Sequence, residues 1–218
     1  MAIVTLKKGR GRPPVPGLVE RRREEFLDAA ARLFAERTYA NTDTQALADD
    51  LGVGKGTIYR YFPTKELLFL AAVDRAMRRL STQVNVDVAS IANPLDRITE
   101  AIRSYLKYFE RNPIVVELLI QERAQFRDRK KPTYFAHRDA NLAPWKDLFT
   151  QLIAQGRFRR MPVDRIVEVL SDLLYGTIFT NHFAGRKNSS AAQAKDVIDI
   201  FLRGVLSDQE RSCQEEIR

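Results

Sequence analysis

The sequence predicts an all-α protein of about nine helices. From Val19 onward, apolar residues recur at spacings of three and four, the pattern of a helix with one buried face. Proline and glycine fall between these periodic segments, where helices are expected to end. No alternating run of β-branched residues is bounded by hairpin signals, so we expect no strand.

The composition is that of a globular protein with a basic balance. Hydrophobic residues make up 44% of the 218 positions and charged residues 29%. No apolar run approaches the ~18 residues of a membrane span, and the N-terminal charges follow a short apolar run, the wrong order for a secretory signal. The single cysteine, Cys213, excludes an intramolecular disulfide and a multi-cysteine zinc site, so we expect a reducing cytoplasm. The formal net charge of +8 favours nucleic acid or an anionic membrane surface as partner.

The first segment, residues 1–17, predicts a flexible basic arm, because its prolines exclude a regular helix. The peptide Arg10-Gly11-Arg12-Pro13 resembles the core of an AT-hook. That resemblance implies that both arginines enter the minor groove of A·T-rich DNA. The alternative is a basic tail with non-specific affinity for phosphates.

Three helices are expected next. The first covers about residues 19–37 and carries one apolar stripe. The second begins at a capping box formed by Thr42 and Gln45, and ends at Gly52, where a left-handed residue is expected. The third covers residues 54–62 and is stopped by the following proline.

The remaining chain predicts further helices and a polar tail. Thr64 is expected to cap the fourth helix, with Glu66 in its first turn. The sixth helix is apolar nearly all round, which indicates a central position, and the seventh is expected to bend near Pro144. These helices are expected over residues 64–80, 95–109, 114–126, 134–155, 161–179 and 191–206, with the tail over residues 209–218.

The second and third expected helices form a helix-turn-helix pattern. The second helix of such a motif must be short and held by the first, so that its outer face can enter the major groove of DNA. Basic and hydroxyl groups on that face suit phosphate contacts, and a glycine allows close approach. From spacing alone, the alternative is an ordinary helical hairpin with a solvated face. The outer face comprises Lys55, Gly56, Thr57, Tyr59 and Arg60.

The run from Thr42 to Leu68 closely resembles the DNA-binding domain of the TetR/AcrR family of bacterial transcriptional regulators. The resemblance implies an N-terminal three-helix DNA-binding domain over residues 18–66 and a helical effector-binding and dimerisation domain over residues 67–208. One departure is Gly54, where the family usually has a Ser or Thr cap, so a phosphate contact from that hydroxyl is lost. The predicted DNA-contacting residues are Arg10, Arg12, Thr42, Gln45, Lys55, Gly56, Thr57, Tyr59, Arg60 and Lys65.

The same resemblance implies an effector pocket within the middle helices and a dimer interface formed by the last two long helices. For each residue the alternative is an ordinary place in the protein's own core. The candidates for the pocket are Tyr105, Phe109, Glu117, Gln121, Trp145 and Tyr175. The candidates for the interface are Leu170, Leu173, Leu174, Ile178, Ile198, Phe201, Leu202 and Val205.

Three patterns that would indicate nucleotide binding, kinase activity or a metal site are incomplete in this sequence. Residues 52–57 lack the Ser or Thr after the lysine, and the preceding strand, of a phosphate-binding loop. His137-Arg138-Asp139 lacks the downstream Asn and the Gly-rich loop of a kinase. His137 and His182 have no metal-ligand spacing. We therefore expect no catalytic residue, no metal and no cofactor.

Together these patterns predict a sequence-specific DNA-binding transcriptional regulator rather than an enzyme. The resemblance implies a ligand-responsive repressor that binds a palindromic operator as a homodimer, with an unknown small-molecule effector and no membrane partner, while the residues themselves do not separate a repressor from an activator. The rival functions are a helical-bundle enzyme and a basic adaptor that uses the C-terminal region. The sequence reveals neither the effector nor the operator.

Overall fold

The computed structural model describes residues 17–186 and 189–215, with the side chains of 213–215 left out. Within these residues the fold is all-α, as predicted, and its only β-pairing is an isolated bridge between Phe158 and Leu206. None of the described helices is long and apolar enough to cross a membrane. The helices are α1 (Leu18–Asn41), α2 (Thr44–Asp50), α3 (Lys55–Tyr61), α4 (Lys65–Val88), α5 (Pro94–Arg111), α6 (Pro113–Gln125), α7 (Thr133–Ala140), α8 (Ala143–Ala154), α9 (Val163–Ala184), α10 (Ser190–Val205) and α11 (Asp208–Glu215).

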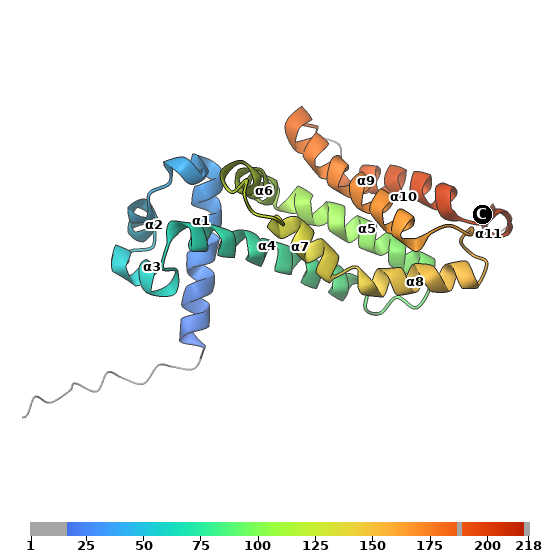
Figure 1. The fold of residues 1–218 in the computed structure, drawn as a ribbon, viewed down its shortest axis with the longest axis horizontal. Coiled ribbons are helices and arrows are strands. Elements are labelled where there is room, and N and C mark those ends of the chain that lie inside the picture. Colours follow the sequence, from blue (N-terminus) through green and yellow to red (C-terminus); the bar gives the residue numbers. More distant parts are fainter. Residues whose placement is uncertain (1–16, 187–188, 216–218) are drawn as a thin grey trace, which may run out of the picture.

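The molecule is elongated, with two regions joined by α4 (Figure 1). Helices α1, α2 and α3 gather at one end, and α5 and α7 to α10 form the bundle that extends away from them. The buried residues Leu68 and Phe69 lie near the start of α4, whereas Met77 and Leu80 lie further along it in the same continuous core. Helix α4 therefore contributes to both regions.

Helix α1 ends differently from the prediction. It was expected to end near Arg37, but it continues to Asn41 across a kink at Thr38, where φ is 66° and ψ is 159°. A positive φ is unfavourable for a β-branched residue. The kink turns the chain toward α2, so neighbouring contacts must maintain it.

The predicted capping box at Thr42 is wrong. Asp43 is the N-cap of α2, and its side chain accepts a hydrogen bond from the Gln45 N–H at 2.8 Å. Thr42 is only 3% exposed, and its hydroxyl donates to the Thr38 carbonyl at 2.6 Å. The cap moves by one residue because the Thr42 hydroxyl is used inside the α1 kink.

Two later segments also differ from the prediction. The single helix expected over residues 134–155 is two helices, because Pro144 occupies the first turn of α8 and cannot continue α7. The expected polar tail contains α11, which Arg157 anchors through Glu210 at 3.0 Å. These two differences explain why the described residues form eleven helices instead of about nine.

Candidate DNA-binding surface and effector cavity

The turn between α2 and α3 and the packing of α3 on the core determine which face of α3 points to solvent. Gly52 has φ of 61°, the left-handed value that glycine adopts without strain, as predicted for the end of α2. Gly54 then caps α3 in an extended conformation without a side-chain hydrogen bond. Ile58 and Phe62 are 1% and 3% exposed, so they hold the inner face of α3 against the core. The outer face is thereby left to solvent.

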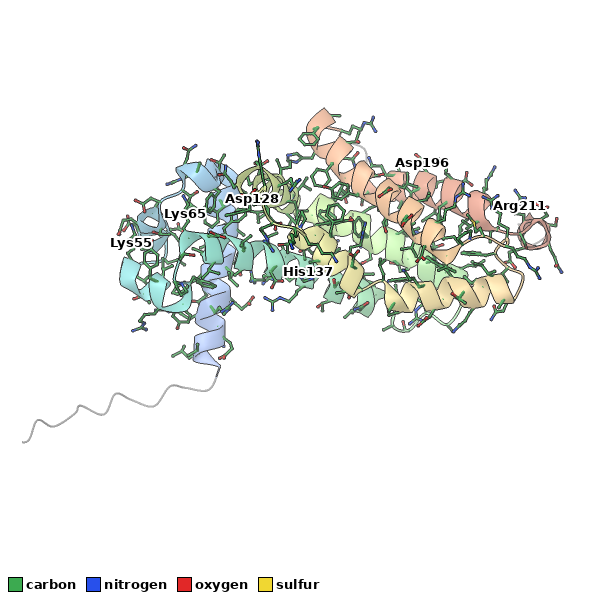
Figure 2. The ribbon with its side chains drawn as sticks, in the orientation of Figure 1. Lys55, Lys65, Asp128, His137, Asp196 and Arg211 are labelled. Atoms are coloured by element: carbon green, nitrogen blue, oxygen red, sulfur yellow. The ribbon has the colours of Figure 1, made fainter. Side chains whose placement is uncertain are left out.

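The outer face of α3 presents the predicted polar groups. Tyr59, Arg60 and Gly56 are exposed, and Lys55 and Thr57 are half-buried. Lys55 lies at the end of the molecule that α2 and α3 form (Figure 2). These groups lie on the solvent side of a short helix whose opposite side packs against the core. They therefore form a surface suited to the major groove of DNA.

Contacts with α2 orient two of these side chains. The Lys55 ammonium lies 3.1 Å from Asp43 Oδ1, and Tyr59 shares a hydrogen bond of 2.9 Å with the Thr44 hydroxyl. The backbone hydrogen bond from Gln45, followed by that from Lys55, lowers the pKa of Asp43. Asp43 therefore stays ionised as the cap of α2 and as the partner of Lys55.

The other predicted DNA contacts lie in different settings. Gln45 is exposed and donates to Asp49 at 2.8 Å. The Lys65 ammonium donates to the Ala40 carbonyl at 3.3 Å and lies 4.5 Å from the centre of the Tyr39 ring. Thr42 faces the interior, so its hydroxyl is not on the surface with the others. Arg10 and Arg12 lie outside the described residues.

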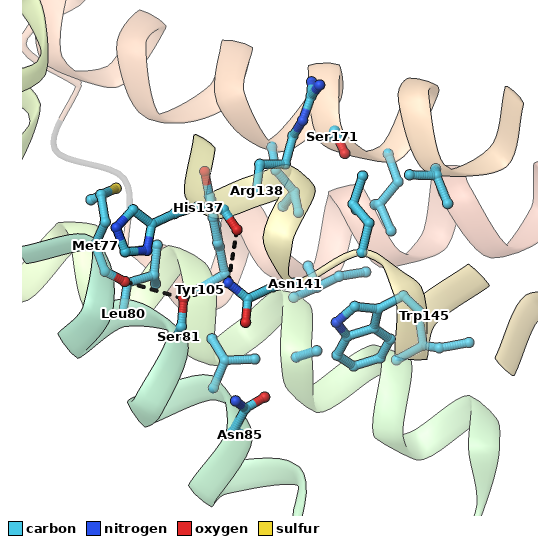
Figure 3. A pocket seen from close by; sticks show the side chains of 18 of the residues that line it. Met77, Leu80, Ser81, Asn85, Tyr105, His137, Arg138, Asn141, Trp145 and Ser171 are labelled. Atoms are coloured by element: carbon cyan, nitrogen blue, oxygen red, sulfur yellow. Dashed lines mark hydrogen bonds between the residues drawn. The ribbon is translucent and has the colours of Figure 1, made fainter. Parts of the chain in front are cut away.

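A cavity of about 170 Å³ lies among α4, α5, α7, α8 and α9. Tyr105 and Trp145, both predicted, line it (Figure 3). Most of the wall is apolar, as in many sites for small molecules. The polar and charged side chains that line it besides these two and Tyr134 are Ser81, Asn85, His137, Arg138, Asn141 and Ser171.

Three hydrogen bonds organise the polar part of the cavity. The hydroxyls of Tyr105 and Tyr134 lie 2.8 Å apart. Burial raises the pKa of Tyr105 well above its usual value and the pKa of Tyr134 to about 12, so both stay neutral. The Asn141 amide donates to the His137 carbonyl at 2.7 Å and to the Ser81 hydroxyl at 3.3 Å.

The other four predicted pocket residues lie away from this cavity. Phe109 packs against the rings of Tyr105 and Tyr108. The ring of Tyr175 packs against that of Tyr134, with 4.8 Å between ring centroids. Glu117 lies 3.4 Å from the His182 ring nitrogen. Gln121 hydrogen-bonds the main chain of α1.

Sequence reasoning missed the polar part of the wall. His137 and Arg138 lie in the last turn of α7 and Asn141 directly follows it, in a segment where one continuous helix was expected. Such a polar cluster in an otherwise apolar region is a weak signal, since a solvated helix face looks the same.

The predicted dimer residues divide into separate groups. Ile178, Phe201 and Val205 are buried in the protein's own core, so they are unavailable to a partner. Leu170 and Leu174 line the cavity, and Leu173, Ile198 and Leu202 are half-buried. The large apolar side chains that α9 and α10 do expose are Val169 (56%), Phe183 (70%) and Ile200 (66%).

Comparison with known proteins agrees with this geometry. Residues 26–72 match the family model described as bacterial regulatory proteins, tetR family. An uncharacterized HTH-type transcriptional regulator of Mycobacterium tuberculosis is 36% identical over 90 residues, 41% of this chain and 45% of that protein. The alignment thus spans less than half of that relative.

Longer similarities extend beyond the DNA-binding region. The HTH-type transcriptional repressor KstR of M. tuberculosis is 25% identical over 87% of this chain and 82% of its own length. The structure of the ketosteroid transcriptional regulator KstR2 of M. tuberculosis superposes with a TM-score of 0.62 and 25% identity, covering 89% of this chain and 100% of that one. The fatty acid degradation regulator FadR of Bacillus halodurans, at 16% identity and a TM-score of 0.72, shares the fold. Residues 26–72 thus carry the helix-turn-helix that the model of the tetR family of bacterial regulatory proteins describes, and the chain as a whole is similar to transcriptional regulators with the same fold.

Proposed function

We propose that this protein is a transcriptional repressor that binds a palindromic operator as a homodimer and releases it when a small molecule occupies the cavity. The observation that carries the proposal is the outer face of α3, where Tyr59 and Arg60 are exposed while Ile58 holds the opposite face in the core. Such a helix fits the major groove. We also propose the boundary between residues 66 and 67, near the start of α4, and action in the cytoplasm, where operator DNA is found.

The exposed apolar residues of α9 and α10 support a homodimer. Val169, Phe183 and Ile200 would lose contact with water if two copies met through these helices. A two-fold axis would then place two α3 helices on successive half-sites, about 34–36 Å apart or at a related spacing.

The cavity supports a small-molecule effector. Its largely apolar wall and few hydrogen-bonding groups fit a mostly apolar molecule with one or two polar atoms. The similar protein KstR2 is described as a ketosteroid transcriptional regulator, and a ketosteroid is a molecule of that general character. An effector that fits the DNA-incompetent conformation better would shift the population away from DNA. No catalytic step is proposed for this cavity.

Selection from genomic DNA tests the proposal. The purified protein is incubated with sheared genomic fragments, and the bound fragments are sequenced. Recovery of a shared palindrome supports a regulator. Equal affinity for that duplex and a scrambled one at physiological salt favours a basic adaptor instead.

Two substitutions separate sequence reading from phosphate binding. Arg60→Ala is expected to reduce discrimination between the recovered and scrambled duplexes, by about 1–3 kcal/mol if Arg60 contacts a base. Lys65→Ala is expected to weaken binding to both duplexes alike and to reduce its salt dependence. Titrations at two salt concentrations measure both effects. An equal loss on both duplexes for Arg60→Ala would assign that side chain to phosphate contacts only.

A further inference from the structure

We propose that the cavity binds a small apolar carboxylic acid. The carboxylate would lie against Arg138 and the hydroxyls of Tyr105 and Tyr134, and the apolar body would lie among α4, α5, α8 and α9. The inference rests on the proposed function, because it names the chemical class of the effector. Three features of the lining carry it: its positive charge, its unused hydrogen-bond donors and its small volume.

The fixed charge of the lining is positive. Among the described residues, Arg138 is the only Lys or Arg side chain that lines the cavity, and no Asp or Glu does. Its side chain extends from α7 on the side of the cavity where Ser171 of α9 lies (Figure 3). Burial raises the pKa of Tyr134 to about 12, while the hydrogen bond with Tyr105 and the charge of Arg138 act in the opposite direction. The charge of Arg138 therefore reaches the tyrosine hydroxyls, and a carboxylate beside them would be attracted to it.

Contacts outside the cavity hold the Arg138 guanidinium in place. Its Nε and Nη2 each lie 2.8 Å from Asp139 Oδ1, and its central carbon lies 5.0 Å from the centre of the Phe135 ring. Asp139 also lies 2.6 Å from the Lys131 ammonium, so two cations share one carboxylate and the cluster keeps a positive charge. The Nη1 of Arg138 has no hydrogen bond within the described part of the chain. A ligand carboxylate can accept from this nitrogen, since the planar guanidinium matches the geometry of a carboxylate.

Three further donors are available to a ligand. Each tyrosine hydroxyl carries one hydrogen, so the bond between Tyr105 and Tyr134 leaves one hydrogen unused. The indole N–H of Trp145 and the hydroxyl of Ser171 also line the cavity, and neither makes a hydrogen bond to a described residue. A carboxylate only accepts hydrogen bonds, whereas an amine would bring a second positive charge close to Arg138. The polar wall therefore favours an acid over a base.

The volume limits the apolar body of the acid. An apolar cavity of about 150 Å³ binds benzene, and this cavity has a volume of about 170 Å³. Its apolar wall includes Leu80, Ile102 and Phe149, which are at most 8% exposed. A benzene ring or a medium-length alkyl chain fits this space, whereas a steroid nucleus or a coenzyme A thioester is much larger. We therefore expect phenylacetate and octanoate to bind better than a ketosteroid.

Trp145 provides a direct readout, because it is the only tryptophan of the chain and lines the cavity. The protein without DNA is titrated with phenylacetate, octanoate and their neutral amides, phenylacetamide and octanamide, while tryptophan fluorescence is recorded. Each acid is expected to change the fluorescence saturably and to bind about tenfold more tightly than its amide. The inferred class is overturned if neither acid binds, if acid and amide bind equally, or if the ketosteroid androstenedione binds more tightly than both acids.

The role of Arg138 is tested with Arg138→Gln, which removes the charge. Both acids are expected to bind about tenfold more weakly to this variant, with little change for the amides. The control is Arg103→Gln, because Arg103 is exposed on α5 and lies outside the cavity, 3.7 Å from Glu100. An unchanged ratio of acid to amide affinity in Arg138→Gln would refute this role.

A second variant keeps the test decisive if Arg138→Gln does not fold, which circular dichroism shows. Arg138→Lys keeps the charge but loses the planar donor group. It is expected to bind the acids more weakly than wild type and still to prefer them to the amides. Affinity for the acids equal to that of wild type would contradict a contact between the guanidinium and the carboxylate.

Release of DNA is measured separately, so that the two proposals can fail independently. Fluorescence anisotropy of the duplex recovered by genomic selection is followed as phenylacetate or octanoate is added. Release from wild type is expected near the dissociation constant of each acid, and Arg138→Gln is expected to need about tenfold more acid. If an acid binds in the cavity but the duplex stays bound, the proposed regulation fails and the ligand class stands. If the duplex is recovered but neither acid binds, the ligand class fails and DNA binding stands.

Discussion

The charged side chain of Arg75 links α4 to α1 through hydrogen bonds to two carboxylates. The guanidinium is 6% exposed and donates to the two carboxylate oxygens of Asp28 at 2.6 and 2.7 Å, and also to Glu24. Hydrogen bonds from Arg75 lower the pKa of Asp28, against a smaller opposing effect of burial. This cluster is a structural link between the DNA-binding helices and the start of the bundle.

The lowered pKa of Asp28 predicts a pH dependence of stability. Since its pKa is lower in the folded than in the unfolded state, the stabilisation is present above the unfolded value of about 3.9 and is lost as the pH falls through the folded value. Asp28→Asn is therefore expected to be less stable than wild type at pH 7, with a smaller further loss below pH 4. Urea unfolding at several pH values measures this. Parallel profiles for the two proteins would contradict it.

At the scale of elements, local signals predicted most of the DNA-binding surface. Gly52, Gly54 and the face of α3 follow from residues within one or two turns of each other, so the sequence pattern alone places them. The kink at Thr38 could not be predicted, because Gln121, which hydrogen-bonds the main chain on both sides of it, lies far away in the sequence. The cavity wall was only partly predicted for the same reason: its polar residues meet through tertiary packing.

The turn between α2 and α3 provides an element-scale prediction. A Cβ added at Gly52 would meet no atom within 4 Å, so substitution there costs only backbone strain. Gly52→Ala is expected to destabilise the helix-turn-helix by about 1–2 kcal/mol, whereas Gly52→Asn is expected to lose less, because asparagine tolerates the left-handed conformation better. Thermal unfolding measures the difference. Equal losses for the two variants would show that strain at this φ is not the cause.

At the scale of the whole molecule, the surface of α9 and α10 exposes other apolar residues than those that the sequence selected for the interface. Apolar periodicity selected residues such as Phe201 and Val205, which are buried in one chain. Periodicity identifies a buried face but does not distinguish a core from an interface, so it did not single out the exposed residues Phe183 and Ile200. Only the arrangement of neighbouring helices shows which apolar side chains remain exposed.

The proposed dimer is tested with Phe183→Asp and Ile200→Asp. Each would place a charge where apolar contact is needed, so sedimentation is expected to show monomers, and affinity for the palindrome is expected to fall with the loss of the second half-site. Val86→Asp is the control, because Val86 is 65% exposed on α4. If all three variants behave as wild type, the assembly uses another surface.

The length of α4 has a mechanical consequence. Three residues separate the end of α3 from this uninterrupted helix of 24 residues, and several residues of its second half line the cavity. A straight α-helix of that size spans ~36 Å, so a tilt of ~5° about one end moves the other by ~3 Å. That displacement is comparable with the rise of one base pair. Sub-ångström rearrangements around a bound molecule can thus be geometrically amplified into a mismatch with the helical repeat of DNA.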